Sequence, residues 1–111
     1  MLEELFGNKN IEKILFYLLV NERCFATELM QRFQTALSPI QKSLDKLERA
    51  GVIVSFSVGK TRVFQFNPRY ALLKELQAFM EKAYDFLPEK IKNQYYEPSI
   101  RKRPRKRTKP L

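Results

Sequence analysis

The sequence predicts a small, mostly α domain with one β-hairpin, in the order helix, helix, helix, strand, strand, helix. Apolar residues recur at helical spacing in residues 9–21, 26–33 and 69–87. A helix with clear end signals covers residues 39–50, and two alternating segments flank Gly59. With 111 residues, the chain is long enough for one hydrophobic core and too short for two.

A first helix is expected from Lys9 to about Asn21, with Asn8 as its N-cap. Its apolar residues form one helical stripe, and further apolar side chains occupy the other sides. A helix that is apolar nearly all round is covered on more than one face. In so small a domain, we expect another subunit to supply the second cover. A shorter second helix is expected at about Ala26 to Phe33, followed by a turn at residues 34–36.

The third helix has the most complete end signals in the sequence. Ser38 is a favoured N-cap, Pro39 suits the first helical position, and Gln41 completes an S-x-x-Q capping box. Gly51 stands where a left-handed residue commonly ends a helix. The helix is therefore expected from Pro39 to Ala50.

Two alternating segments, Val52 to Val58 and Arg62 to Asn67, predict the strands of a hairpin. A shift of one residue turns every side chain to the opposite face, so the loop length decides which residues pair. A three-residue loop at residues 59–61 pairs Phe56 with Phe64 and collects the apolar side chains on one face. We therefore expect this odd-length loop.

A last helix is expected from Arg69 to Leu87, started by Asn67-Pro68 and ended by Pro88. It carries two adjoining apolar stripes, which predicts that it packs on its own domain and on a partner helix. We expect a homodimer built from the first and last helices of a domain that spans residues 1–87. The residues expected at the dimer interface are Ile14, Phe16, Tyr17, Leu72, Leu76, Phe79, Ala83 and Phe86.

Two short helices joined by a tight turn and followed at once by a hairpin have the geometry of a winged helix-turn-helix. In that geometry, the second of the two helices enters the major groove of DNA. Glutamine suits adenine and lysine suits guanine in the major groove. The residues expected to reach base edges are Pro39, Gln41, Lys42 and Asp45.

Phosphate contacts are expected around the same helix and at the hairpin tip. The helical candidates are Arg32, Ser38, Lys46 and Arg49, and the wing candidates are Lys60, Thr61 and Arg62. A plainer alternative stays open, because outward polar residues and charges at a hairpin tip also serve solubility alone.

Residues 26–68, from ATELM to FQFNP, resemble the winged-helix core of the ArsR-like transcription regulators. The chain is also similar to small stand-alone winged helices that begin with a Leu-Phe-Gly-(Ser/Asn)-Lys segment, here Leu5 to Lys9. The strongest piece is L-x-x-L-x-x-A-G-V-I at residues 44–53, followed by F-x-F-N at residues 64–67. The resemblance covers about Leu5 to Leu87 and implies a homodimer that binds an inverted repeat.

The positive charge is concentrated near the C-terminus. The net charge is +9, yet residues outside 101–109 carry 14 basic and 12 acidic side chains. Residues 88–97 are expected to form a short helical or irregular extension, and residues 98–111 a disordered basic tail. We expect the tail to contact nucleic acid, although it also fits a merely solubilising role. Its basic residues are Arg101, Lys102, Arg103, Arg105, Lys106, Arg107 and Lys109.

Several classes of protein do not fit the composition. The chain has no His and a single cysteine, Cys24, so neither a disulfide framework nor a metal site of the ArsR-like kind is expected. Cys24 is expected to be a small buried hydrophobic residue. No Gly-rich phosphate loop or paired catalytic carboxylates are evident, so we expect no enzyme and no cofactor. No apolar run is long enough for a membrane span, and we expect a cytoplasmic protein.

The leading hypothesis is a homodimeric, sequence-specific regulator of transcription that binds double-stranded DNA, most simply as a repressor. One alternative keeps the fold but makes it a protein-interaction module or an antitoxin-like partner protein. Another is a non-specific nucleic-acid binder that acts through the basic tail.

Overall fold

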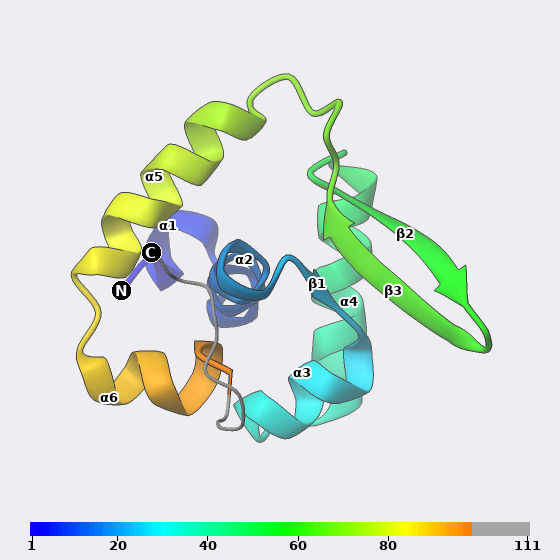
Figure 1. Cartoon of the computed structure of the whole chain (residues 1–111), viewed down its shortest axis with the longest axis horizontal. Coiled ribbons are helices and arrows are strands. Elements are labelled where there is room, and N and C mark those ends of the chain that lie inside the picture. The colour runs from blue at the N-terminus through cyan, green and yellow to red at the C-terminus, as the bar shows by residue number, and fades with distance from the viewer. Residues whose placement is uncertain (99–111) are drawn as a thin grey trace.

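The computed structural model describes residues 1–98, so the basic residues of the tail lie outside the described part. Helix α2 (Lys9–Asn21) lies at the centre (Figure 1). Helices α3 (Ala26–Phe33) and α4 (Leu37–Arg49) lie on one side of it and α5 (Leu73–Asp85) on another, while the hairpin of β2 (Ile53–Val58) and β3 (Thr61–Phe66) projects outward (Figure 1). This arrangement is the predicted winged helix-turn-helix, and it confirms the fold class.

The N-terminal part follows the local signals. A single turn of helix, α1 (Glu3–Phe6), precedes Asn8, whose Oδ1 accepts hydrogen bonds from the backbone N–H groups of Asn10 at 2.7 Å and Ile11 at 3.3 Å. Asn8 is therefore the N-cap of α2, as predicted, and the helix has the predicted ends.

The second cover of α2 comes from the chain itself, which corrects the expectation of another subunit. After α5, a short helix α6 (Glu89–Ile91) and a π-helical turn η1 (Lys92–Tyr96) return the chain to α2 and α3 (Figure 1). Tyr96 is only 2% exposed, and its ring lies 5.5 Å from that of Phe16. The ring of Tyr84 in α5 lies 5.7 Å from Phe16 on another side. Residues 88–97, named here the C-terminal extension, thus complete the core.

Helix α4 begins two residues earlier than predicted, which corrects the assignment of Ser38 as N-cap. Ala36 is the N-cap and supplies no side-chain hydrogen bond, so Ser38 lies in the first turn and the S-x-x-Q box does not form. Pro39 fits there because the N–H groups of a first helical turn have no partner within the helix. Gln34 is the C-cap of α3 and has a left-handed backbone, at φ +54°. Ala36 is the last extended residue of the tight turn, so α4 begins directly after it at Leu37.

The other end of α4 agrees with the sequence. Gly51 has φ +83°, its N–H donates to Glu48 O at 3.0 Å, and the N–H of Val52 donates to Leu47 O at 3.0 Å. These two bonds form a Schellman motif, which satisfies the last carbonyl groups of the helix. The side-chain amide of Asn67 also donates to Gly51 O at 2.9 Å, which ties the end of β3 to the end of α4.

The register of the hairpin differs from the prediction. The loop has two residues, so Val58 pairs with Thr61 and Phe56 with Val63 rather than with Phe64. A strand that no sequence pattern predicted, β1 (Arg23–Cys24), pairs with β3 and gives the order β1-β3-β2. Phe64 is 5% exposed and Phe56 37% exposed, because the helices and Cys24 bury the face that carries Phe64.

Helix α5 starts four residues later than predicted. Asn67 Oδ1 accepts the Arg69 N–H at 3.0 Å, and successive turns join Tyr70 to Asn67 and Leu73 to Tyr70 before the helix begins. Asn67 therefore caps a turn rather than a helix. The helix ends at Asp85, with Phe86 as its C-cap.

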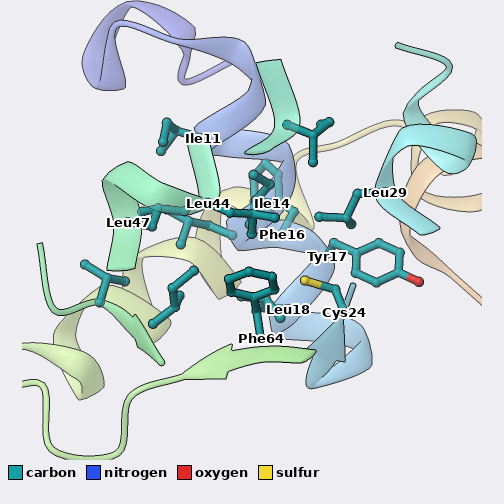
Figure 2. Close-up of a cluster of buried hydrophobic side chains, with 14 of the residues drawn as sticks. Ile11, Ile14, Phe16, Tyr17, Leu18, Cys24, Leu29, Leu44, Leu47 and Phe64 are labelled. Atoms are coloured by element: carbon teal, nitrogen blue, oxygen red, sulfur yellow. The ribbon is translucent and has the colours of Figure 1, made fainter. Parts of the chain in front are cut away.

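The core gathers around α2 (Figure 2). Ile14, Phe16 and Leu18 of α2 lie among side chains from α3, α4 and β3, and Cys24 lies beside Phe64 and Tyr17 (Figure 2). Cys24 is 1% exposed, and burial raises the pKa of its thiol to about 12. This confirms Cys24 as a small buried hydrophobic residue. No helix among residues 1–98 is long and apolar enough to cross a membrane.

Candidate nucleic-acid interface

The outward face of α4 is polar and open to solvent. Ile40, Leu44 and Leu47 follow one another at i, i+4, i+7 spacing and are buried in the core. The opposite face of the helix therefore points outward. The exposed side chains there are Gln41, Lys42, Asp45, Lys46 and Arg49.

The structure brings three of the four residues expected at base edges, Gln41, Lys42 and Asp45, together with the wing residues in one groove. A hollow of about 550 Å³ lies between α4 and the β2–β3 hairpin, with the start of α3 at one end. Ser38, in the first turn of α4, lies on the α4 side of this hollow. The sequence-predicted residues that line it are Ser38, Gln41, Lys42, Asp45, Lys60, Thr61 and Arg62.

A second hollow, of about 440 Å³, adjoins the first along α4. Pro39, Lys46 and Arg49 line it, together with Ser38, Lys42 and Asp45, which also border the first hollow. The outward face of α4 is therefore a ridge between two polar depressions. Such a ridge has the shape that a major groove receives, since the groove is about as wide as a helix.

The wing is fixed to α4 by a small polar network. Ser55 Oγ donates to Glu48 Oε2 at 2.6 Å, and Arg62 Nε donates to Ser55 Oγ at 3.0 Å. The guanidinium of Arg62 also forms an ion pair with the Glu48 carboxylate. Glu48 was not among the residues expected at the site, and its contacts with the wing were not predicted from the sequence. The length of the hairpin loop is the signal that could have predicted this network. Only a loop of two residues, not three, places Arg62 and Ser55 on the same face of the hairpin.

This network changes the role available to Arg62. Its positive charge is balanced by Glu48, whereas Lys42, Lys46, Arg49 and Lys60 stand exposed on the same surface. The resulting surface, named here the α4–wing face, carries more basic than acidic residues although the chain outside the tail is close to neutral. A local basic patch of this kind attracts a polyanion without a strong overall field.

Arg32 lies elsewhere, which corrects its expected role in phosphate binding. Its guanidinium donates to Glu97 O at 2.7 Å and lies 5.9 Å from the ring centre of Tyr17. Arg32 therefore holds the C-terminal extension against α3. The sequence separation of 65 residues explains why no local pattern revealed this contact.

The residues expected at a dimer interface fall into three groups. Ile14, Phe16 and Tyr17 are buried in the core of their own chain, so they are not free to meet a partner and this part of the expectation is wrong. Ala83 is buried and Leu76 half-buried. The three that remain exposed, Leu72, Phe79 and Phe86, lie along one side of α5 and at its ends.

Comparison with known proteins agrees with this geometry. Residues 8–54 match a family model described as winged helix-turn-helix DNA-binding. These residues run from the N-cap of α2 through α4 to the start of β2 and include the outward face of α4. A comparison with curated proteins finds no match.

Two solved structures share the fold. The adhesin competence repressor AdcR from Streptococcus pyogenes has a TM-score of 0.55 and 15% identity, over 68% of this chain and 57% of that one. A MarR family transcriptional regulator from Silicibacter pomeroyi also has a TM-score of 0.55 and 15% identity, over 75% of this chain and 59% of that one. The chain thus spans less than two thirds of the length of these regulators, and the likeness is one of fold.

Proposed function

We propose that this winged helix-turn-helix chain is a transcription regulator that binds double-stranded DNA through the α4–wing face. The observation that carries the proposal is the groove of about 550 Å³ in which Gln41, Lys42 and Asp45 of α4 face Lys60 and Thr61 of the wing. The solved regulators of the same fold bear names of transcription regulators and repressors, which supports the same class of function here.

In this proposal, Gln41 and Lys42 read base edges from the first half of α4. The amide of a glutamine matches the N6 and N7 of adenine, and a lysine ammonium matches the O6 and N7 of guanine. Lys46, Arg49 and Lys60 flank them and bind backbone phosphates, which set the register on the duplex. Arg62 orients the wing through Glu48 and Ser55.

We further propose that the regulator acts as a homodimer on an inverted repeat, most simply as a repressor. Leu72, Phe79 and Phe86 are 58%, 44% and 70% exposed, and large apolar side chains in a row on a small protein mark an association surface. Two copies joined through α5 present two α4 helices to one face of the DNA. Half-site centres are then expected about 34–36 Å apart, one turn of the duplex.

The test is a selection from random duplex DNA at physiological salt. It uses the full-length chain and a variant of the same length in which the seven basic residues of 101–109 are replaced by glutamine. A two-fold symmetric motif retained by both proteins supports the proposal. If the neutralised chain retains no DNA, the α4–wing face is not a DNA site.

A substitution then assigns the base contact. Gln41→Ala is expected to change base preference at one position in each half-site, at a cost of about 1–3 kcal/mol for the preferred base. Lys46→Ala is the matched control on the same helix, and it is expected to weaken all sequences equally. If Gln41→Ala also weakens binding to all sequences equally, Gln41 takes no part in base recognition.

A second candidate function rests on the same α5 stripe. If a different protein rather than a second copy covers Leu72, Phe79 and Phe86, the chain is a protein-interaction module. A monomer at the concentrations of the selection, together with no enriched motif, favours that function over the first.

A further inference from the structure

The exposed apolar side chains of α5 recur at one fixed interval. Leu72, Phe79 and Phe86 are seven residues apart, and all three are exposed. Seven residues are nearly two turns of an α-helix, so each of these side chains lies almost directly in line with the next. Apolar residues repeated at this interval are typical of a helix that packs along the length of another helix. The three side chains, named here the α5 ridge, therefore suit a helical partner.

Only one side of the α5 ridge is covered by the chain itself. Met80 and Ala83 are buried where α5 packs on α2, and they follow the middle of the ridge on one side of the helix. Helix α5 lies along the outer edge of the molecule (Figure 1). The ridge is thus the border between a covered face and an open one, and a partner can approach it from the open side.

Two opposite charges flank the ridge on its open side. Glu75 lies four residues before Phe79 and Lys82 three residues after it, and both side chains are exposed. At about 100° of rotation per residue, both lie on the side of the ridge away from Met80. They are about 10 Å apart along the helix axis, which is too far for them to pair with each other.

These two charges have no partner within residues 1–98. Neither Glu75 nor Lys82 takes part in an ion pair or a side-chain hydrogen bond in this part of the chain. No basic residue lies three or four positions from Glu75, where a helical ion pair would form. An unpaired acid and an unpaired base beside an apolar ridge are available to a partner with the reverse arrangement.

A second copy of α5 has that reverse arrangement when it runs in the opposite direction. A two-fold axis at Phe79 places this residue opposite its own copy and Leu72 opposite Phe86 of the second copy. The same axis keeps the flanking charges on one side of the pair, so Glu75 of each copy lies opposite Lys82 of the other. A parallel pair would instead place Glu75 level with Glu75 and on the opposite side of the pair, where no ion pair forms. The charges therefore favour an antiparallel pair.

We infer that α5 packs antiparallel on α5 of a second copy, with Phe79 on the two-fold axis and Glu75 of each copy paired with Lys82 of the other. This rests on the homodimer of the proposed function and deepens it, because it names the direction and the register of the interface. The occupant is a second copy rather than a different protein, because the ridge and its two charges are complementary to themselves. The two-fold axis also relates the two α4–wing faces, as an inverted repeat requires.

The first test reverses the charges in the full-length chain. Glu75→Lys or Lys82→Glu alone places like charges opposite each other at two symmetric positions. Each is expected to weaken self-association about fivefold to tenfold, measured by sedimentation equilibrium. The double variant, with both charges reversed, restores opposite charges and is expected to regain the affinity of the parent chain. Lys74→Glu is the matched control, since this exposed residue lies on the same helix away from the ridge.

The second test locates the two-fold axis by cross-linking. Phe79→Cys is expected to form a disulfide between two copies on oxidation with oxidised glutathione, because the two side chains meet at the axis. Leu72→Cys is the control, since the two copies of this residue lie at opposite ends of the pair, about 40 Å from reach of zero separation when both halves of the ridge are counted as about 20 Å. The native Cys24 is 1% exposed and does not compete.

The outcomes separate the register from the homodimer. Recovery by the double variant, together with cross-linking of Phe79→Cys alone, supports the antiparallel pair. A double variant that associates no better than the single variants overturns the register while the homodimer stands. A parent chain that stays monomeric overturns both and favours a different protein on α5. Binding of DNA by the α4–wing face is decided separately by the selection from random duplexes, so that failure is distinct.

Discussion

The outward faces of α4 and α5 are built in opposite ways. On α4, Ile40, Leu44 and Leu47 are buried and the outward positions are polar, so the helix is stable with one face in water. On α5, Met80 and Ala83 are buried, yet Leu72, Phe79 and Phe86 stand in water. The contrast separates two kinds of surface: one suited to a hydrated polyanion, and one that gains free energy when it is covered.

A second difference lies between α2 and α5. Both helices are apolar on more than one side, and both suggest a partner from sequence alone. The C-terminal extension covers the second side of α2, with Tyr96 against Phe16, and nothing among residues 1–98 covers the outer stripe of α5. Any partner helix is therefore expected on α5 alone.

The largest expected effect is loss of the cover on α2. Tyr96→Ala removes a buried ring that contacts Phe16, Phe33 and Tyr84, and it is expected to cost about 3–5 kcal/mol of the free energy of unfolding. Urea denaturation followed by circular dichroism measures the change. A loss below about 1 kcal/mol contradicts the role of the extension as part of the core.

The next effect concerns the stripe on α5. Phe79→Asp is expected to leave the unfolding of a monomer within about 0.5 kcal/mol, because this side chain is exposed. It is expected to weaken self-association by about 2 kcal/mol or more if Phe79 is central to the dimer. Sedimentation equilibrium measures the self-association of the parent chain and of the Phe79→Asp variant. Lys74→Asp, at an exposed position on the same helix, is the control. Unchanged association moves the interface away from α5.

A smaller effect is expected at the C-terminal end of α4. Gly51→Ala adds a Cβ that meets no atom within 4 Å, so its cost is only that of a left-handed backbone at φ +83°. That cost is about 1–2 kcal/mol in the free energy of unfolding. Ala50→Gly, one residue earlier in an ordinary helical conformation, is the control and should cost less. A neutral Gly51→Ala variant means that the turn adopts another conformation.

The smallest effect is expected at the link between α4 and the wing. Glu48→Gln removes the charge that pairs with Arg62, and such partly exposed pairs contribute about 0.2–1 kcal/mol. Stability should fall by no more than that, while affinity for duplex DNA rises because Arg62 becomes available to phosphate. Fluorescence anisotropy against a labelled duplex measures the affinity, and a weaker complex shows that the orientation of the wing matters more than its charge.

The sequence by itself determined the elements whose signals are local. Asn8 caps α2 because its side chain needs only the N–H groups of the next turn. Gly51 ends α4 because only glycine adopts that backbone at little cost. The outward set on α4 followed from the i, i+4, i+7 spacing of three buried residues, and three of its members, Gln41, Lys42 and Asp45, line the groove with the wing.

Only the tertiary structure decided the rest, because the deciding contacts join residues far apart in the sequence. The register of the hairpin depends on β1 and the helices behind Phe64, which no alternation within the strands reveals. Arg32 is drawn from the expected phosphate surface to a carbonyl 65 residues away. Phe16 is buried because a later segment of the same chain covers it, whereas Tyr17 packs against Phe33 of α3. An apolar pattern predicts that a face is covered, but not which element covers it.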